Sequence, residues 1–379
     1  MKIKEFKLHE LEMEMKHPFT TSFGTQTKRH ITIVEAVNAD GLSGFGECVA
    51  GEDPLYSEEF MDSAMIAMKK YFAPIIIKNE ISHPDEVWDL LVPFKKNNMA
   101  KAGIEGAVWD LYAKENDRTL AETVGGRKAE VDVGISLGLE DTDELLLDRI
   151  QEKVDEGYKR IKVKIKPGRD VSMIRKVRAV FPDIPLMVDA NSAYTLDDTE
   201  LLKSLDEFNL MMIEQPLAAG DIVDHAKLQK EIKTPVCLDE SIDSYQAAKA
   251  AIELGSCEII NVKVGRVGGI TQSKKIHDLA ERHNIPLWCG GMLEAGVGRL
   301  HNIAITTLSN FTLPGDTASS SRYWEEDIIT PEVVAEQGVV QVSGKPGIGA
   351  EVDFNKMKKY LKQTITITED DAPDMVFFD

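Results

Sequence analysis

The chain has 379 residues, of which 43% are hydrophobic and 28% are charged, as in an ordinary globular protein. Its formal net charge of −20 argues against nucleic acid or anionic lipid as a partner, because phosphate groups are bound by basic surfaces. It has no run of about 18 apolar residues, which excludes a conventional membrane-spanning helix.

The cysteines and the N-terminal run indicate the cellular setting. Cys48, Cys237, Cys257 and Cys289 have neither paired zinc spacing nor a dense disulfide pattern. The first 16 residues, MKIKEFKLHELEMEMK, alternate charged and apolar residues and lack the apolar core of a signal peptide. We therefore expect a reducing, cytoplasmic setting. The length favours two domains, and closed symmetric assemblies are common, so we also expect a homo-oligomer.

The first section, residues 1–125, predicts strands followed by helices. Apolar and acidic residues alternate from Leu11 to Met15, and the run 31–37 reaches a turn at Asp40-Gly41. Later, Ile104, Ala107, Val108, Leu111 and Tyr112 mark one apolar face of a helix. Strands followed by helices, without alternation, are typical of a separate α+β domain.

The middle section, residues 126–320, alternates strand-like apolar runs with helical patterns. Five charged residues close successive runs at steps of 25, 25, 25 and 24 residues: Lys164, Asp189, Glu214, Asp239 and Lys263. That interval is about one strand, one helix and two loops, the βα unit of a parallel barrel or sheet. In a barrel, the residues that do chemistry lie at the C-terminal ends of the strands, so we expect these five to form one site.

The last section, residues 321–379, loses this period. A glycine-rich stretch, residues 344–349, precedes what we predict to be a short helical tail. We expect this segment to pack back on the first domain.

Two lysines alternate with β-branched residues in the run 161–165, so both Lys162 and Lys164 are expected to project into the barrel. One interpretation is that nearby carboxylates neutralise them and that they serve packing alone. The other is that burial and the like charge of Lys162 lower the pKa of Lys164, which makes it a base near neutral pH. Lys263 should lie across the barrel, so a bound substrate has a lysine on each face. That geometry suits abstraction of a proton α to a carboxylate.

Three carboxylates on adjacent strand ends would repel one another unless a cation lies between them. Hard oxygen ligands favour Mg²⁺, with Mn²⁺ as an alternative. The competing interpretation is that each acid caps the next helix. Capping easily explains one such acid, but it poorly explains three acids at the same interval in successive units. Glu240 and Asn191 are expected to support these ligands from behind.

These motifs resemble the muconate-lactonizing subgroup of the enolase superfamily, over nearly the whole chain. Within it, four stretches resemble the o-succinylbenzoate synthase / N-succinylamino acid racemase family: GECVAGEDPLYSEE from Gly46, IKVKIKPG, NVKVGRVGG and GGMLEAGVGRLHN. The resemblance implies an α/β fold, with a TIM-type (β/α)7β barrel over residues 126–320. An α+β capping domain would be built from residues 1–125 and the C-terminal segment 321–379.

The resemblance also implies roles for single residues. Lys164 and Lys263 would be the acid/base pair, and Lys162 would hold the substrate carboxylate. The magnesium ligands would be Asp189, Glu214 and Asp239.

Further positions match parts of the family that contact the substrate. An arginine in the loop after the second lysine accompanies racemase activity, and Arg266 stands there, although a surface salt bridge is the alternative. Residues 17–25 and 51–56 match two loops that close over the substrate. Their aromatic residues Phe19, Phe23 and Tyr56 would shield the site from water or anchor the loops to the barrel rim. Ser136, at the end of the first barrel strand, is a further candidate substrate contact.

The implied function is o-succinylbenzoate synthase, a Mg²⁺-dependent syn-dehydration in menaquinone biosynthesis. Lys164 would remove an α-proton from a small carboxylate substrate and return it to the departing hydroxide, while Lys263 steadies the enediolate. Racemisation of N-succinylamino acids would use one lysine for each enantiomer, and it is the alternative main activity.

Three other functions receive less support. Dipeptide epimerases carry an Asp-x-Asp pattern near the eighth strand, and the corresponding residues 314–318, PGDTA, lack the second acid. Muconate cycloisomerisation uses the same lysines and metal. A non-catalytic binding barrel would be expected to lose at least one of the five charged residues, and all five are present.

Overall fold

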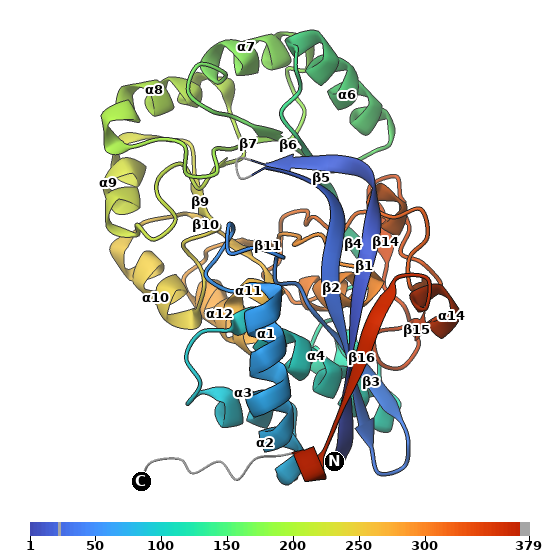
Figure 1. The fold of residues 1–379 in the computed structure, drawn as a ribbon. Helices are drawn as coiled ribbons and strands as arrows, with labels where there is room; N and C mark the ends of the chain where they lie inside the picture. Colours follow the sequence, from blue (N-terminus) through green and yellow to red (C-terminus); the bar gives the residue numbers. More distant parts are fainter. Residues whose placement is uncertain (22–23, 372–379) are drawn as a thin grey trace.

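The structure is a computed structural model that describes residues 1–21 and 24–371. Its first layer is an antiparallel sheet in the order β16-β1-β2-β3, which confirms the strands expected near the N-terminus. The strands are β1 (Ile3–Thr21), β2 (Gly24–Asn38), β3 (Ser43–Cys48) and β16 (Leu361–Thr368). β1 and β2 form a long hairpin that rises from this domain toward the other half of the molecule (Figure 1).

Helices pack against this sheet. They are α1 (Met61–Ala67), the π-helical segment η1 (Met68–Phe72), α2 (Ala73–Lys78), α3 (Asp85–Leu91), α4 (Asn98–Glu115) and α5 (Leu120–Val124). The predicted apolar face of α4 is buried except at Tyr112, which is half-buried. Most of the rest of this helix is buried too, because it lies between the sheet and the second domain.

Glycine allows β3 to approach α4 closely. A Cβ at Gly46 would lie 2.0 Å from the carbonyl oxygen of Gly103, and one at Gly44 would lie 2.3 Å from that of Ala107. No side chain fits at either distance, so the GFGEC segment of β3 requires glycine at these two positions.

The second domain contains a curled, seven-stranded parallel sheet in the order β11-β10-β9-β8-β7-β6-β5. Its strands are β5 (Gly134–Leu137), β6 (Arg160–Lys164), β7 (Leu186–Asp189), β8 (Ile213–Glu214), β9 (Val236–Leu238), β10 (Ile259–Val262) and β11 (Leu287–Cys289). β8 has two residues, and Glu214 is the last of them. The parallel βα alternation expected from the 25-residue interval is confirmed.

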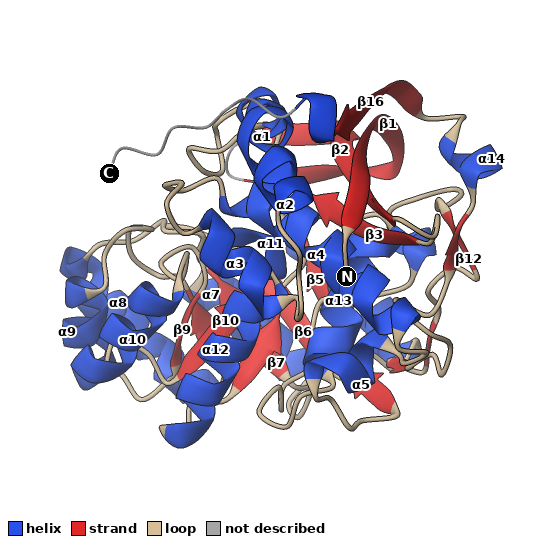
Figure 2. Cartoon of the chain, turned by 90° about the horizontal axis from the view of Figure 1, so that it is seen from below, coloured by secondary structure: helices blue, strands red, loops and turns tan. Residues whose placement is uncertain are grey.

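Helices cover the outer face of these strands in an arc, as Figures 1 and 2 show. They are α6 (Asp143–Asp155), α7 (Val171–Val180), α8 (Thr199–Ser204), α9 (Val223–Glu231), α10 (Tyr245–Leu254), α11 (Val264–Val267), α12 (Ile270–Arg282) and α13 (Gly296–Thr306). Short 3-10 turns occur at Leu196–Asp198, Leu205–Phe208, Ser320–Arg322 and Glu369–Asp371.

The segment 313–316 lies between the two edges of the parallel sheet. The amides of Leu313 and Asp316 donate to Leu287 and Cys289 of β11. On the other side, Gly315 exchanges hydrogen bonds with Asp132 and Gly134 and forms a parallel bridge with Val133.

The C-terminal part differs from the predicted helical tail. Its described residues after the glycine-rich stretch contain one α-helix of four residues, α14 (Phe354–Met357), and then β16, which pairs with β1 along seven positions. The prediction was wrong because the partner of β16 lies more than 350 residues away, and a local pattern does not reveal that pairing. Smaller strands are β4 (Glu130–Asp132), β12 (Ile329–Thr330), β13 (Ala335–Glu336), β14 (Val339–Gln341) and β15 (Glu351–Val352).

A buried carboxylate joins the two domains. Glu47 of β3 accepts hydrogen bonds from the amides of Ala295 (2.9 Å) and Gly298 (2.7 Å) at the start of α13. Burial raises the pKa of Glu47 to about 8, further raised by the nearby charge of Glu294. The contact fixes the N-terminal sheet against the helix that follows β11.

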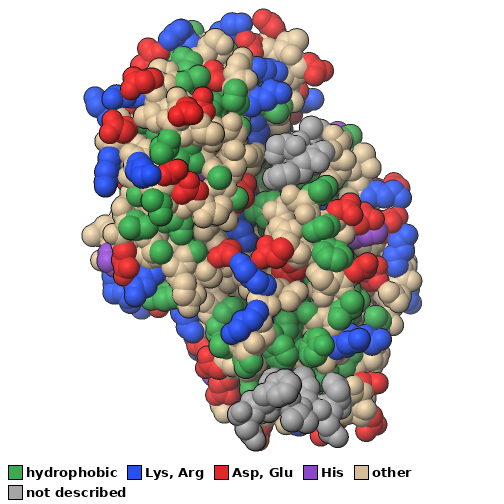
Figure 3. All heavy atoms as spheres, turned by 60° about the vertical axis from the view of Figure 1, so that its left-hand side comes forward, with side chains coloured by type: hydrophobic (Ala, Val, Ile, Leu, Met, Phe, Trp, Pro, Cys, Tyr) green, Lys and Arg blue, Asp and Glu red, His purple; other side chains and the backbone are tan. Residues whose placement is uncertain are grey.

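Among the described residues, no helix is long and apolar enough to cross a membrane. Acidic and basic side chains are mixed over the face shown in Figure 3, although the net charge is strongly negative.

Candidate active site

The five charged residues of the 25-residue interval lie at the C-terminal ends of neighbouring parallel strands. Lys164, Asp189 and Glu214 are the last residues of β6, β7 and β8. Asp239 and Lys263 directly follow β9 and β10. The three carboxylates therefore occupy the middle of the row, and the two lysines lie on the strands that flank them. All three acids are buried, with at most 2% of each residue exposed.

Tight turns end the central strands. Asn191 after β7 and Gln215 after β8 have positive φ angles of 42° and 39°. The side-chain oxygen of Gln215 accepts hydrogen bonds from the amides of Asp239 (3.0 Å) and Ser241 (3.2 Å). This link fixes the end of β9 relative to the end of β8.

Asp189 is shared by two lysines. Its Oδ2 accepts a hydrogen bond of 2.6 Å from Lys164, and the ammonium of Lys162 lies 3.2 Å from the same oxygen. Although burial opposes ionisation, the charges of Lys164 and Lys162 lower the pKa of Asp189 to about 2. The carboxylate attracts both ammonium groups to the same oxygen and so offsets the repulsion between them.

Glu214 lies deepest in the row. Its two oxygens accept hydrogen bonds from Asn261 (2.7 Å) and Lys162 (2.9 Å). Burial raises its pKa to about 8, and the negative charge of Asp189 acts in the same direction.

Asp239 faces the other lysine. Its Oδ2 accepts a hydrogen bond of 2.9 Å from Lys263, and its Oδ1 accepts one from Arg266. Burial would lower the pKa of Lys263, but the charge of Asp239 raises it above the usual value. Lys263 also donates to the hydroxyl of Tyr56 (3.2 Å), and its ammonium lies 5.2 Å from the centroid of that ring.

Arg266 is not a surface residue, so the alternative of a surface salt bridge was wrong. It is buried, donates to the carbonyl oxygens of Ile242 and Asn261, and donates to Tyr56 at 3.2 Å. Short α11 places it there, one turn after Lys263.

Asn191 and Glu240 lie behind Lys164. The amide oxygen of Asn191 accepts a 2.6 Å hydrogen bond from Lys164, and its amide nitrogen donates to Glu240 at 3.2 Å. The second carboxylate oxygen of Glu240 is buried and has no hydrogen-bond partner. Burial raises the pKa of Glu240 to about 7, and the charge of Asp239 adds to this effect.

Other predicted residues have different outcomes. Ser136 donates to both oxygens of Asp316, at 3.1 and 3.2 Å, and does not contact the three acids. Tyr56 lies at the site, as described above. Phe23 lies outside the described residues, as does the side chain of Phe19.

Within the described part of the chain, no three His, Cys, Asp or Glu side chains are grouped closely enough to hold a metal ion. Lysine and arginine donors hold the carboxylate oxygens of the site instead.

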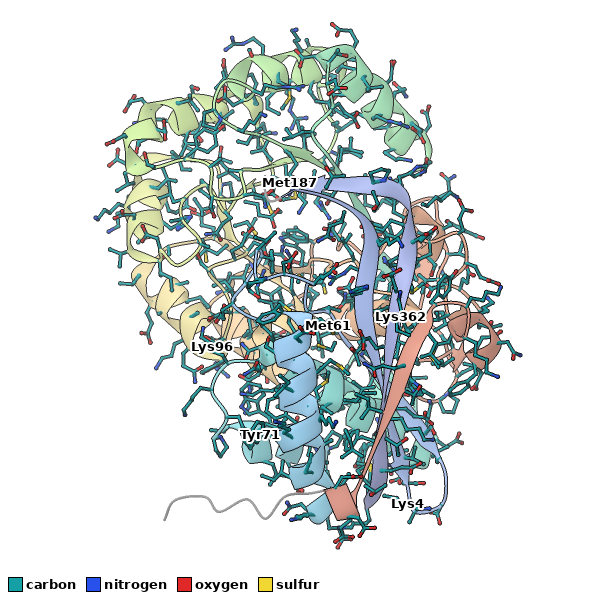
Figure 4. All side chains as sticks on the ribbon, viewed as in Figure 1. Lys4, Met61, Tyr71, Lys96, Met187 and Lys362 are labelled. Atoms are coloured by element: carbon teal, nitrogen blue, oxygen red, sulfur yellow. The ribbon has the colours of Figure 1, made fainter. Side chains whose placement is uncertain are left out.

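Sequence reasoning missed a group of buried residues beside this site, which includes Arg160. Arg160 is buried, lies 4.6 Å from the ring of Trp288, and forms an ion pair of 2.5 Å with Asp316. It also approaches the sulfur of Met187, which is labelled in Figure 4. A signal existed: residues 160, 162 and 164 alternate on β6 and therefore share the inward face.

Comparisons with known proteins identify the family of the chain. Residues 145–356 match the family described as "Enolase C-terminal domain-like". Residues 4–125 match the family described as "Mandelate racemase / muconate lactonizing enzyme, N-terminal domain".

Similar individual proteins span almost the whole chain. An o-succinylbenzoate synthase of Geobacillus kaustophilus is 56% identical, covering 94% of this chain and 95% of its own. An N-succinylamino acid racemase of Thermus thermophilus is 46% identical, covering 93% of this chain and 95% of its own.

Among solved structures, an enolase superfamily member from Listeria innocua matches with a TM-score of 0.95 and 42% identity. The match covers 97% of this chain and 100% of the Listeria chain. Sequence matches to both domains, high identity over nearly the full length, and a shared fold lead to one conclusion: the chain belongs to the enolase superfamily, within its mandelate racemase and muconate lactonizing enzyme group.

Proposed function

We propose that this enzyme is an o-succinylbenzoate synthase that also racemises N-succinylamino acids. One similar protein is named for each of these activities, and each aligns with more than nine-tenths of the chain. The observation that carries the proposal is the position of Lys164 and Lys263 on β6 and after β10, with the three acids on the strands between them. A substrate over the acids would therefore meet one ammonium group from each side.

In the dehydration, Lys164 as the free amine would take the proton α to the substrate carboxylate. It would then return that proton to the departing hydroxide, so that the C–H and C–O bonds break and water leaves. Lys263, which keeps its positive charge beside Asp239, would stabilise the enediolate from the other side. Lys162 would contact the substrate carboxylate.

In racemisation, either lysine would take the α-proton and the opposite lysine, in its ammonium form, would return one to the other face. Arg266 and Tyr56 favour this second activity. Tyr56 accepts a hydrogen bond from Lys263, and Arg266 donates to both Tyr56 and Asp239. They would hold that lysine in a fixed place when it has to act as a base.

The donor set fits Mg²⁺, with Asp189, Glu214 and Asp239 as the ligands that would hold it. All three are buried hard oxygen donors at the ends of neighbouring parallel strands, and carboxylate oxygens are ligands that Mg²⁺ prefers. When bound, Mg²⁺ supplies Lewis-acid stabilisation of the developing negative charge, a contribution of several kcal/mol.

Charge balance supports a substrate with two carboxylates. Four cationic side chains face four carboxylates: Lys162, Lys164, Lys263 and Arg266 against Asp189, Glu214, Asp239 and Glu240. The set is neutral when all eight groups are ionised, and Mg²⁺ would add two positive charges to it. Both the precursor of o-succinylbenzoate and an N-succinylamino acid carry two carboxylates, which restore neutrality in a buried site.

We further propose that the parallel sheet is a closed (β/α)7β barrel over residues 126–320. The segment 313–316 supports this, because it forms hydrogen bonds with both β11 and the residues that lead into β5. The capping domain would comprise residues 1–125 with the C-terminal segment 321–379, as supported by the pairing of β16 with β1.

A side-by-side kinetic assay tests the function. The Mg²⁺-loaded enzyme is given the dehydration substrate and a panel of N-succinylamino acids, and kcat/KM is measured for each. We expect turnover of the dehydration substrate and of at least one N-succinylamino acid. Activity on neither class, with turnover of a dipeptide or a muconate, would contradict the proposal.

A further inference from the structure

Lys162 is a buried ammonium group among three carboxylates. It donates to Glu214 at 2.9 Å and lies 3.2 Å from Asp189. The third carboxylate is Asp316, whose Oδ2 lies 3.7 Å from the same nitrogen. Among the described residues, no other carboxylate forms an ion pair with Lys162.

Asp316 is held firmly on its other side. Its Oδ1 accepts a hydrogen bond of 2.5 Å from Arg160 and one of 3.1 Å from Ser136. The guanidinium of Arg160 is fixed in turn by the carbonyl oxygen of Pro314 (3.0 Å) and by the ring of Trp288. Gly134 provides the room, because a Cβ there would lie 2.4 Å from the guanidinium. Arg160 therefore occupies Oδ1 of Asp316, whereas Oδ2 lies 3.2 Å from the Ser136 hydroxyl and 3.7 Å from the ammonium of Lys162.

Lys162 and a divalent cation compete for the same oxygens. If Asp189 and Glu214 hold Mg²⁺, their lone pairs are no longer available to the ammonium, and the two cations repel each other strongly in a buried site. Lys162 then needs another anion, since a buried ammonium without a partner is costly. Asp316 is already within 3.7 Å, so a small rotation of the lysine side chain suffices.

On the basis of the magnesium site proposed above, we infer that Asp316 is a positioning residue for Lys162. Its Oδ2 receives the ammonium group when Mg²⁺ is bound to Asp189 and Glu214. This movement of the ammonium group frees the oxygens of Asp189 and Glu214 for the metal, and it keeps Lys162 where it meets the substrate carboxylate.

The competing interpretation is that Asp316 only neutralises Arg160. Asp316→Asn separates the two roles, because asparagine has nearly the same volume and its carbonyl oxygen still accepts from Arg160 and Ser136. Its amide nitrogen replaces the oxygen that faces Lys162, and it is a donor that cannot bind an ammonium. Asp316→Glu, which retains the charge, is the matched control.

The experiment measures the Mg²⁺ dissociation constant of the full chain by titration calorimetry, with folding verified by circular dichroism. We expect Asp316→Asn to weaken Mg²⁺ binding about tenfold and Asp316→Glu to weaken it by less than about threefold. In a Lys162→Met background, adding Asp316→Asn should change the dissociation constant by less than about twofold, because the residue that it positions is gone.

An unchanged dissociation constant in Asp316→Asn would overturn the inference. So would an equal loss in the Lys162→Met background, which would reflect only the electric field of the carboxylate. A crystal structure of the unmodified enzyme with Mg²⁺ gives a test that needs no variant. We expect Lys162 Nζ within hydrogen-bond distance of Asp316 Oδ2, and a lysine that stays on Glu214 beside the metal would contradict this. If the unmodified enzyme binds no Mg²⁺, the proposed metal site fails as well, whereas normal Mg²⁺ binding with no effect of Asp316→Asn removes this inference alone.

Discussion

The ammonium group of Lys164 lies 2.6 Å from the carboxylate of Asp189, its neighbour across the β6–β7 pair. The same lysine donates to Asn191 at 2.6 Å. Held in this way, Lys164 directs its N–H groups at these two oxygens rather than at a substrate. Releasing it requires another cation on Asp189.

Removal of divalent metal is therefore expected to abolish activity. Without Mg²⁺, Lys164 stays on Asp189 and Lys162 stays on Glu214. Dialysis against a chelator followed by assay tests this, with restoration by Mg²⁺ as the control. Mg²⁺ should also stabilise the fold, by about 2.7 kcal/mol at a hundredfold excess over its dissociation constant. Full activity in the presence of chelator would show that the ligand assignment is wrong.

Tyr56→Phe is expected to lower kcat/KM about tenfold for both reactions. The hydroxyl of Tyr56 accepts hydrogen bonds of 3.2 Å from both Lys263 and Arg266, and a hydrogen bond to a charged group contributes about 1.5–3 kcal/mol. Tyr71→Phe is the control, since Tyr71 is partly exposed on η1, far from the site in Figure 4. Equal kinetics in Tyr56→Phe and the unmodified enzyme would argue that Tyr56 only anchors its loop.

Gly46→Ala is expected to destabilise the fold by about 1–3 kcal/mol or more, because the new Cβ would lie 2.0 Å from the Gly103 carbonyl oxygen. Denaturant unfolding measures the change. Gly138→Ala is the control, since a Cβ there meets no atom within 4 Å. Equal stability of the two variants would mean that β3 can move away from α4 at little cost.

The stability of the fold is expected to depend on pH through His301. This residue is buried on α13, and burial lowers its pKa to about 4 from an ordinary value of 6.5. Between these values this histidine binds more protons in the unfolded chain than in the folded one, so the contribution of His301 to stability falls as the pH decreases from about 6.5 to 4.

The full effect of His301 on the free energy of unfolding is about 3 kcal/mol, because a tenfold change in proton affinity corresponds to about 1.4 kcal/mol. Urea unfolding of His301→Asn and of the unmodified chain at several pH values isolates it. His283→Asn serves as the exposed control. A difference between the His301 variant and the unmodified chain that stays constant with pH would contradict the buried neutral imidazole.

Much of the second domain could be predicted from the sequence. Asp189 was expected to close a strand and is the last residue of β7, because a short apolar run with a fixed interval is a local signal. The row of Lys164, three acids and Lys263 followed from the same interval. Local patterns carry this information because each βα unit repeats the same geometry.

The missed features depend on contacts between distant residues. Arg160 is buried only because Gly134 lacks a side chain and Trp288 offers its ring, and these lie on β5 and β11. β16 is a strand because β1 has a free edge beside it. A surface salt bridge was the alternative interpretation of Arg266, because the sequence does not show that α11 directs this side chain toward Asp239.

The central claim is that Lys164 and Lys263 act on opposite sides of the bound substrate. Its most direct test follows exchange of the α-proton of each enantiomer of an N-succinylamino acid in deuterated water, by Lys164→Ala and Lys263→Ala. Neither variant should racemise, and each should exchange one enantiomer only, with opposite preference. Rapid exchange of both enantiomers by either variant would contradict the account.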